Sequence, residues 1–83
     1  MNSMSKPKIF ADFENADPLG RVRLNTVGTS EDLVRHGIRL EDNLLIELYD
    51  EDLVVTGIVR RSNEEGIWVA EVDWGDVREV PEK

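Results

Sequence analysis

The stretch LLIELYDEDLVVTGIVRR, residues 44 to 61, decides the fold that the rest of the chain must complete. Leu44, Ile46 and Leu48 share one parity, as the buried face of a strand requires. Residues 53 to 61 are the richest β-branched run of the chain, and three acidic residues at 50 to 52 precede them as a turn. We expect one strand at 44 to 49 and a second at 53 to 61.

The sequence that follows predicts a third strand of the same meander. Residues 63 to 66 begin with Asn and end with Gly, which favours a turn into a strand at 67 to 74. Trp68 and Trp74 share one face of that strand, where a place in the core is favoured over contact with a ligand. Gly57, inside the central strand, predicts a bulge or a sharp bend.

The amino-terminal half predicts a wide hairpin and a short helix. Alternating apolar residues predict a strand at 8 to 13, and the sequence Asp-Pro-Leu-Gly at 17 to 20 is typical of a type I turn leading into a paired strand at 21 to 24. Thr29 and Asp32 resemble a capping box, and Gly37 can end a helix over residues 30 to 36, whose Leu33 and Val34 the sheet would hold.

The remaining segments complete a single domain. We expect a disordered tail at 1 to 7, a folded domain at 8 to 80 and a short turn or edge strand at 76 to 80. Five strands with one bent strand and one short helix favour a mainly β fold, a small five-stranded SH3-like barrel, because closure removes exposed sheet edges. An open α+β antiparallel sheet with one covering helix is the alternative.

Composition narrows the class of protein. The chain has 83 residues, a length that allows one compact core but leaves little room for a deep cleft. Its net charge is −8. It contains no cysteine, so disulfides and thiolate metal sites are excluded. No segment is long and apolar enough for a signal peptide or a membrane span, so we expect a cytoplasmic protein without membrane contact.

The sequence offers no set of residues for catalysis, metal binding or a cofactor. His36 is the single histidine and has no nucleophile in a recognisable pattern with it. The acidic turn at 50 to 52 lacks the spacing of a calcium loop, and the six glycines form no phosphate-binding loop. We therefore expect no enzyme activity. A small enzyme that uses an acid near Asp73 together with His36 is the weakest of the alternatives.

The leading hypothesis is a binding or regulatory module that contacts another protein. Aromatic and arginine side chains dominate the energetics of many protein interfaces. The candidate partner-binding residues are Tyr49, Arg60, Arg61, Trp68 and Trp74. The molecule itself would be a monomer or a weak homodimer, since an edge strand can pair with a copy of itself.

The alternative function is nucleic-acid binding through an arginine face. Arg21, Arg23, Arg60 and Arg61 would have to converge on one side of the domain. The net negative charge disfavours this function, because a polyanion would approach against overall repulsion.

Three resemblances add to these expectations. Residues 20 to 55, with their Gly-Arg-Val strand, short helix and hairpin, resemble the swapped-hairpin transition-state regulators, which implies a dimer whose arginines meet DNA. Residues 44 to 78 are similar to SH3-like and Tudor-type barrels, which implies the barrel fold alone. With Ala-Asp-Phe at 11 to 13 and Gly-Arg-Val-Arg-Leu at 20 to 24, the whole chain resembles small bacterial proteins of unknown function.

Overall fold

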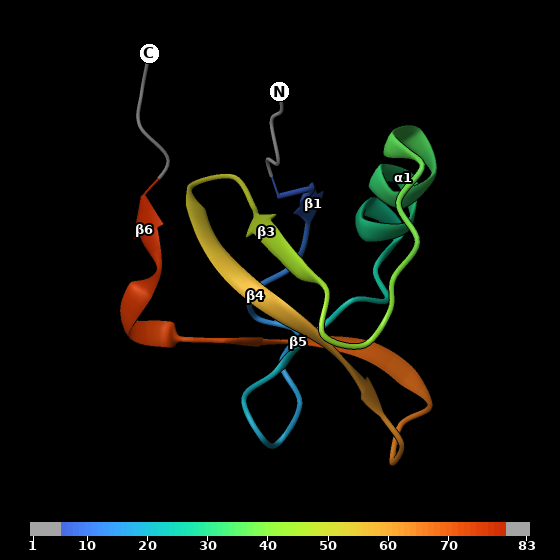
Figure 1. Ribbon diagram of the computed structural model, residues 1–83. Helices are drawn as coiled ribbons and strands as arrows, with labels where there is room; N and C mark the ends of the chain where they lie inside the picture. The colour runs from blue at the N-terminus through green and yellow to red at the C-terminus, as the bar shows by residue number, and fades with distance from the viewer. Residues whose placement is uncertain (1–5, 80–83) are drawn as a thin grey trace.

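The computed structural model describes residues 6 to 79 and shows a mainly β fold with one helix (Figure 1). The strands are β1 (Lys8–Phe10), β2 (Val22–Arg23), β3 (Leu45–Tyr49), β4 (Leu53–Ser62), β5 (Ile67–Val72) and β6 (Arg78–Glu79). The helix is α1 (Val27–His36), and a short 3-10 helix, η1 (Trp74–Asp76), follows β5. The predicted fold class is confirmed.

The strands form a strongly curled half-barrel. Five strands follow one another in the order β1-β3-β4-β5-β2, and β6 pairs with β4 outside this path. The pairing of β3 with β4 and of β4 with β5 is antiparallel, so the predicted three-stranded meander is confirmed. Within the described residues β1 and β2 do not pair with each other, which leaves the barrel half open.

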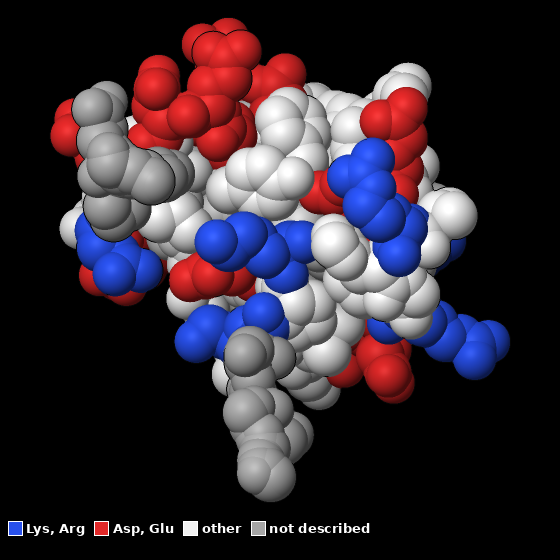
Figure 2. Space-filling model, turned by 90° about the horizontal axis from the view of Figure 1, so that it is seen from above, with Lys and Arg blue, Asp and Glu red and all other residues white. Residues whose placement is uncertain are grey.

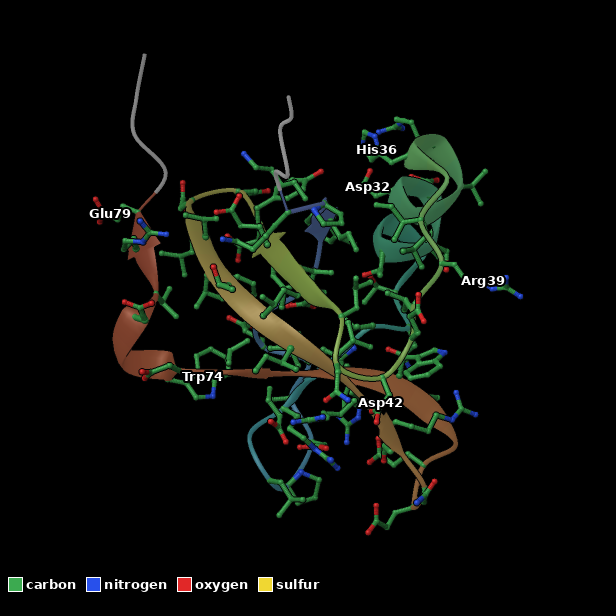
Figure 3. All side chains as sticks on the ribbon, viewed as in Figure 1. Asp32, His36, Arg39, Asp42, Trp74 and Glu79 are labelled. Atoms are coloured by element: carbon green, nitrogen blue, oxygen red, sulfur yellow. The ribbon has the colours of Figure 1, made fainter. Side chains whose placement is uncertain are left out.

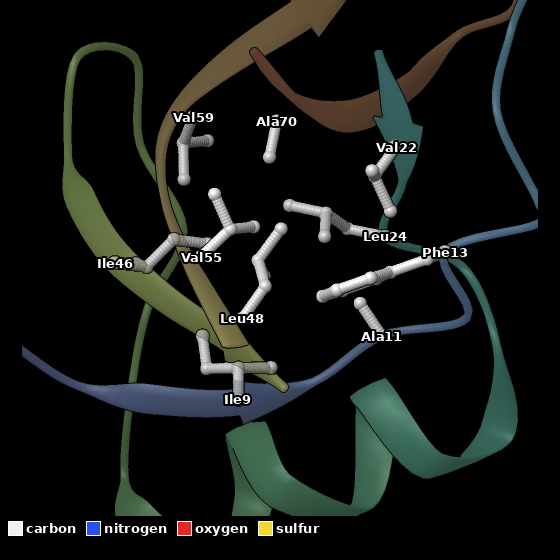
Figure 4. Packing of buried hydrophobic residues seen from close by; sticks show 10 residues of the cluster. All are labelled: Ile9, Ala11, Phe13, Val22, Leu24, Ile46, Leu48, Val55, Val59 and Ala70. Atoms are coloured by element: carbon white, nitrogen blue, oxygen red, sulfur yellow. The ribbon is translucent and has the colours of Figure 1, made fainter. Parts of the chain in front are cut away.

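The core lies on the inner face of the curled sheet (Figure 4). Ile46 and Leu48 of β3 meet Val55 and Val59 of β4, all of them with the parity that alternation predicts. The other buried members are Ile9, Ala11, Phe13, Val22, Leu24 and Ala70. One continuous cluster therefore joins both halves of the chain.

Gly57 lies inside β4, opposite Ile46 of β3 and Val72 of β5, and the register is continuous through it, so the bulge that the sequence suggested does not form there. A Cβ atom at this position would lie 3.2 Å from the Cβ of Ala70 and 3.2 Å from Cγ1 of Val72. These distances are shorter than ordinary carbon contacts, so the close approach of the two strands depends on glycine.

The predicted hairpin between residues 8 to 13 and 21 to 24 is wrong. β1 pairs in parallel with β3, and β2 pairs with β5. The strand stops early because Asp12 turns the chain: its side chain accepts a hydrogen bond from the backbone of Glu14, and its carbonyl accepts one from Asn15. A smaller hairpin forms instead, with Ala16 opposite Val22.

The turn of that smaller hairpin is the predicted one. The backbone N–H of Gly20 donates a 2.9 Å hydrogen bond to the carbonyl of Asp17. Gly20 has φ 84°, a conformation that favours glycine. The sequence thus identified the turn correctly and assigned it to the wrong pair of strands.

The helix begins earlier than expected, and its cap is a different residue. Thr26 is the N-cap and accepts a hydrogen bond from the backbone of Thr29, whereas Thr29 itself is fully buried inside α1. Gly37 ends the helix in the left-handed conformation, as predicted. Leu33 packs against the core, but Val34 is 83 % exposed, so the expectation that the sheet holds it is wrong.

The two ends of the domain also differ in detail. The carbonyl of Pro7 accepts a 2.8 Å hydrogen bond from Glu47 of β3, so this residue of the predicted tail is attached to the sheet. Most of that tail, residues 1 to 5, lies outside the described residues, as does Val80. The predicted strand at 67 to 74 ends at Val72, and the expected edge strand is β6.

Candidate functional site

A buried polar contact fixes α1 against the edge of the sheet. The Asp32 carboxylate accepts hydrogen bonds from the backbone N–H of Phe10 at 2.9 Å and from the hydroxyl of Tyr49 at 2.7 Å. The hydroxyl of Thr29 donates to the carbonyl of Phe10 at 2.7 Å. Both outward backbone groups of Phe10 are therefore bonded to side chains of the helix, in the place where a further strand would bond.

This contact shifts the ionisation of its two acidic groups. The hydrogen bond from Tyr49 lowers the pKa of Asp32, with further help from the Phe10 N–H, Arg35 and His36 against the opposing effect of burial. The same bond, together with burial, raises the pKa of Tyr49. The second carboxylate oxygen of Asp32 accepts a 3.1 Å hydrogen bond from Arg35, so both oxygens are engaged within the domain.

The structure does not bring Tyr49 together with Arg60 and Arg61. Tyr49 pairs with Val54 at one end of the β3-β4 ladder, whereas Arg60 lies six residues further along β4. At about 3.3 Å per residue this separates them by about 20 Å. The expected surface cluster of these three residues is not formed.

The four arginines of the predicted nucleic-acid face each have a partner within the domain. Arg21 pairs with Asp17 at 2.8 Å. Arg23 makes two hydrogen bonds to Glu65, at 2.8 and 2.9 Å. On β4, Arg60 bonds to Asn43 and lies 3.4 Å from Glu71, while Arg61 donates to the carbonyl of Gly66.

These arginines also divide between the two faces of the sheet. Arg23 and Arg60 both lie opposite Val69 of β5, one on each side, which places them about 10 Å apart across the outer face. Arg61 belongs to the other parity of β4 and stacks over Trp68, with its guanidinium carbon 5.1 Å from the ring centroid. No single face therefore carries all four guanidinium groups.

Two of these ion pairs change the ionisation of their carboxylates. Burial alone would raise the pKa of Asp17, but hydrogen bonds from the backbone and side chain of Arg21 bring it below its usual value. The hydrogen bond from Arg23 lowers the pKa of Glu65 and, reciprocally, raises that of Arg23. The positive charge of each of these two arginines is therefore balanced by a carboxylate within the domain.

The two tryptophans differ in environment and do not share a strand face. Trp68 is half-buried against the core on β5. Trp74 lies in η1, at the corner where the chain leaves β5 (Figure 3), and remains 44 % exposed. The expectation of a shared face fails because β5 ends at Val72, before Trp74.

Trp74 is nevertheless held in one orientation. Its indole N–H donates a 2.9 Å hydrogen bond to the carbonyl of Gly20. Its ring meets that of Phe13 edge to face, with centroids 6.2 Å apart. The exposed part of the indole is thus a rigid surface feature.

Leu19, in the turn whose Gly20 bonds to Trp74, was missed by the sequence analysis. It directly precedes Gly20, the hydrogen-bond partner of Trp74, and is 73 % exposed. A large apolar residue between Pro18 and Gly20, within a tight turn, was the available signal, because such turns point their central side chains into solvent. We call Leu19 and Trp74 together the Trp74 surface.

A second exposed apolar patch lies on the outer side of α1. Val27 and Val34, seven residues or about two helical turns apart, are 74 % and 83 % exposed. They line a shallow hollow with Ser30, Glu31 and Arg35. This patch offers two small aliphatic side chains and no aromatic ring.

Acidic residues gather where the turn after β3 meets β6. Glu79 lies opposite Leu53, next to the turn formed by residues 50 to 52. Figure 2 shows acidic side chains along one edge of the face seen from above. Across residues 6 to 79, no group of three or more His, Asp or Glu side chains has the arrangement of a metal site.

The described part of the chain contains no helix with the length and apolar character needed to cross a membrane. Comparison of the chain with protein-family models, with curated proteins and with solved structures found no match in any of the three.

Proposed function

We propose that this domain is a non-catalytic module that binds another protein in the cytoplasm, and that the Trp74 surface is its contact site. The observation that carries the proposal is the 44 % exposure of Trp74, an indole fixed at one edge by Gly20 and Phe13. Tryptophan is among the residue types most enriched at the centre of protein interfaces, and the exposed Leu19 directly precedes its hydrogen-bond partner Gly20.

Tyr49, Arg60 and Arg61, which the sequence also predicted to bind a partner, are less available for such a contact. The hydroxyl of Tyr49 is bonded to Asp32, and Arg60 and Arg61 are engaged with Asn43 and Trp68. Recruiting these groups to a partner would first break contacts within the domain. Trp74 and Leu19 require no such exchange.

Nucleic-acid binding remains the alternative function, with weaker support. Phosphate recognition needs free guanidinium groups, whereas Arg21 and Arg23 are paired with carboxylates at 2.8 Å. The net charge of −8 opposes a polyanion in addition.

The experiment is affinity capture from a native cell lysate treated with nuclease, comparing the wild type with two matched variants. Leu19→Ser removes the exposed aliphatic side chain of the Trp74 surface, and Val34→Ser removes one of similar exposure from the outer side of α1. We expect Leu19→Ser to lose the retained protein and Val34→Ser to keep it, with both variants unfolding at the wild-type temperature.

Two results would contradict the proposal. Loss of the partner in Val34→Ser alone would move the contact to α1. Retention that disappears with nuclease would favour the arginine alternative instead.

A further inference from the structure

The ionisable residues next to Trp74 in the chain are all acidic. Every ionisable residue between positions 71 and 77 is acidic, and Asp73, Asp76 and Glu71 are all exposed. Phe13, whose ring meets the indole edge to face, is flanked in the chain by two more exposed acids, Asp12 and Glu14. The partly exposed indole therefore has acidic residues next to it in the chain and next to its contact residue Phe13, and we call Asp73 and Asp76 its acidic border.

Few cations offset this charge. Arg21 follows the turn that holds Trp74, but its guanidinium is bonded to Asp17. Glu71 is paired with Arg60 at 3.4 Å, and Arg78 is the next base along the chain. Among the ion pairs of the described residues, Asp73 and Asp76 have no cationic partner.

We propose that the Trp74 surface binds a segment of a partner protein that carries Lys or Arg beside an apolar side chain. A cation over an indole face is attracted by the ring, and the carboxylates of Asp73 and Asp76 complement its charge. Leu19 supplies the apolar contact. This inference rests on the proposed function and adds the chemistry of the partner.

The acidic turn at 50 to 52 provides the internal comparison. It carries three acidic residues in succession, but no large apolar side chain within the turn is exposed beside them. Binding driven by charge alone would use both places, whereas binding to an aromatic surface with an acidic border selects Trp74.

The test is a titration followed by nuclear magnetic resonance, because each of the two tryptophans gives its own indole N–H signal. The probe is a short end-blocked peptide of alternating Lys and Leu, compared with the same peptide carrying Gln or Glu in place of Lys. We expect a saturable shift of the Trp74 indole signal and of the Gly20 and Gly75 amides with the Lys peptide. The Gln peptide should bind about tenfold more weakly, and added salt should weaken the Lys peptide.

Two pairs of substitutions localise the effect. Asp73→Asn with Asp76→Asn removes the two carboxylates on either side of Trp74 in the chain, and Asn at position 73 can still accept the hydrogen bond that the Asp73 side chain receives from the Gly75 N–H. Glu51→Gln with Asp52→Asn removes equal charge from the acidic turn. We expect only the first pair to weaken the Lys peptide, and the same pair to weaken capture of the lysate partner.

The failures are distinguishable. Equal binding of the Lys and Gln peptides, or capture that depends on Leu19 but not on Asp73 and Asp76, overturns the cationic partner and leaves the protein-binding function standing. Absence of any shift at Trp74 with the Lys peptide, or shifts confined to residues 50 to 52, also overturns the inference. Capture that ignores Leu19 overturns the proposed function itself.

Discussion

The hydroxyl of Tyr49 donates a 2.7 Å hydrogen bond to the Asp32 carboxylate, and this bond joins the end of β3 to the middle of α1. Only 3 % of Asp32 is exposed, so its charge is stabilised almost entirely by this donor, the Phe10 N–H and Arg35. The position of the helix therefore depends on two ionisation states: a deprotonated aspartate and a protonated tyrosine.

Acidification should destabilise the domain through Asp32. Its pKa is lowered from 3.8, so its contribution is fully present above about pH 4 and is lost as the pH falls further. Asp32→Asn should lower the free energy of unfolding by about 1 to 3 kcal/mol at pH 7. In this variant stability should fall less steeply with acidification. Some of the fall should remain, because the pKa of Asp17 is also lowered in the folded protein. Urea unfolding at a series of pH values measures this, and parallel curves for the two proteins would contradict it.

Alkaline pH should act through Tyr49, the only tyrosine of the chain. Its pKa is raised from 10.0, so the folded state holds the proton more tightly and its contribution is lost as the pH rises through 10 and above. Tyrosinate absorbance should titrate at a higher pH in the folded protein than in urea. Asp32→Asn should move the folded midpoint back, and Tyr49→Phe should cost about 2 kcal/mol at neutral pH.

Replacing Gly28 with alanine should destabilise the domain, although glycine-to-alanine substitutions inside helices usually stabilise a protein. A Cβ at this position would lie 2.6 Å from Cδ2 of Phe10, so Gly28→Ala must displace the ring or the helix. We expect a loss of about 1 to 3 kcal/mol, whereas Ser30→Ala on the exposed side of α1 should gain a few tenths of a kcal/mol, roughly the difference in helix propensity. Equal stabilisation by both variants would show that Gly28 has room.

Substitution of Gly57 should oppose the close approach of β4 and β5. Gly57→Ala places a methyl group 3.2 Å from carbons of Ala70 and Val72, and we expect a loss of about 1 to 3 kcal/mol. Combining it with Val72→Ala removes one of the two opposing carbons. The double variant should therefore lose less than the sum of the single losses by about 1 kcal/mol, measured as a double-mutant cycle of unfolding free energies. Strict additivity would contradict the contact.

Local signals in the sequence predicted the parts of the fold that depend on neighbours in the chain. The alternation of Leu44, Ile46 and Leu48, the turn at 17 to 20 and the cap at Gly37 are each set by residues within a few positions. The partner of β1 was not predictable in this way, because parallel pairing with β3 joins residues 39 positions apart, such as Lys8 and Glu47.

The candidate site was harder to predict for the same reason. Trp74 was identified from its residue type, but its exposure follows from the end of β5 at Val72 and from the distant carbonyl of Gly20. Asp32 was interpreted as part of a cap, because its spacing of three residues from Thr29 resembles a capping box. Its actual partners, Phe10 and Tyr49, are 22 and 17 positions away.

The covered backbone of Phe10 has a consequence for the behaviour of the protein in the cell. An uncovered strand edge is a template on which identical chains can stack into insoluble fibrils. Thr29 and Asp32 occupy the bonding groups that such stacking would use at Phe10. Chains in which α1 detaches while the core persists should therefore precipitate before the core unfolds. The yield of soluble protein would then measure how firmly α1 is bound to the sheet.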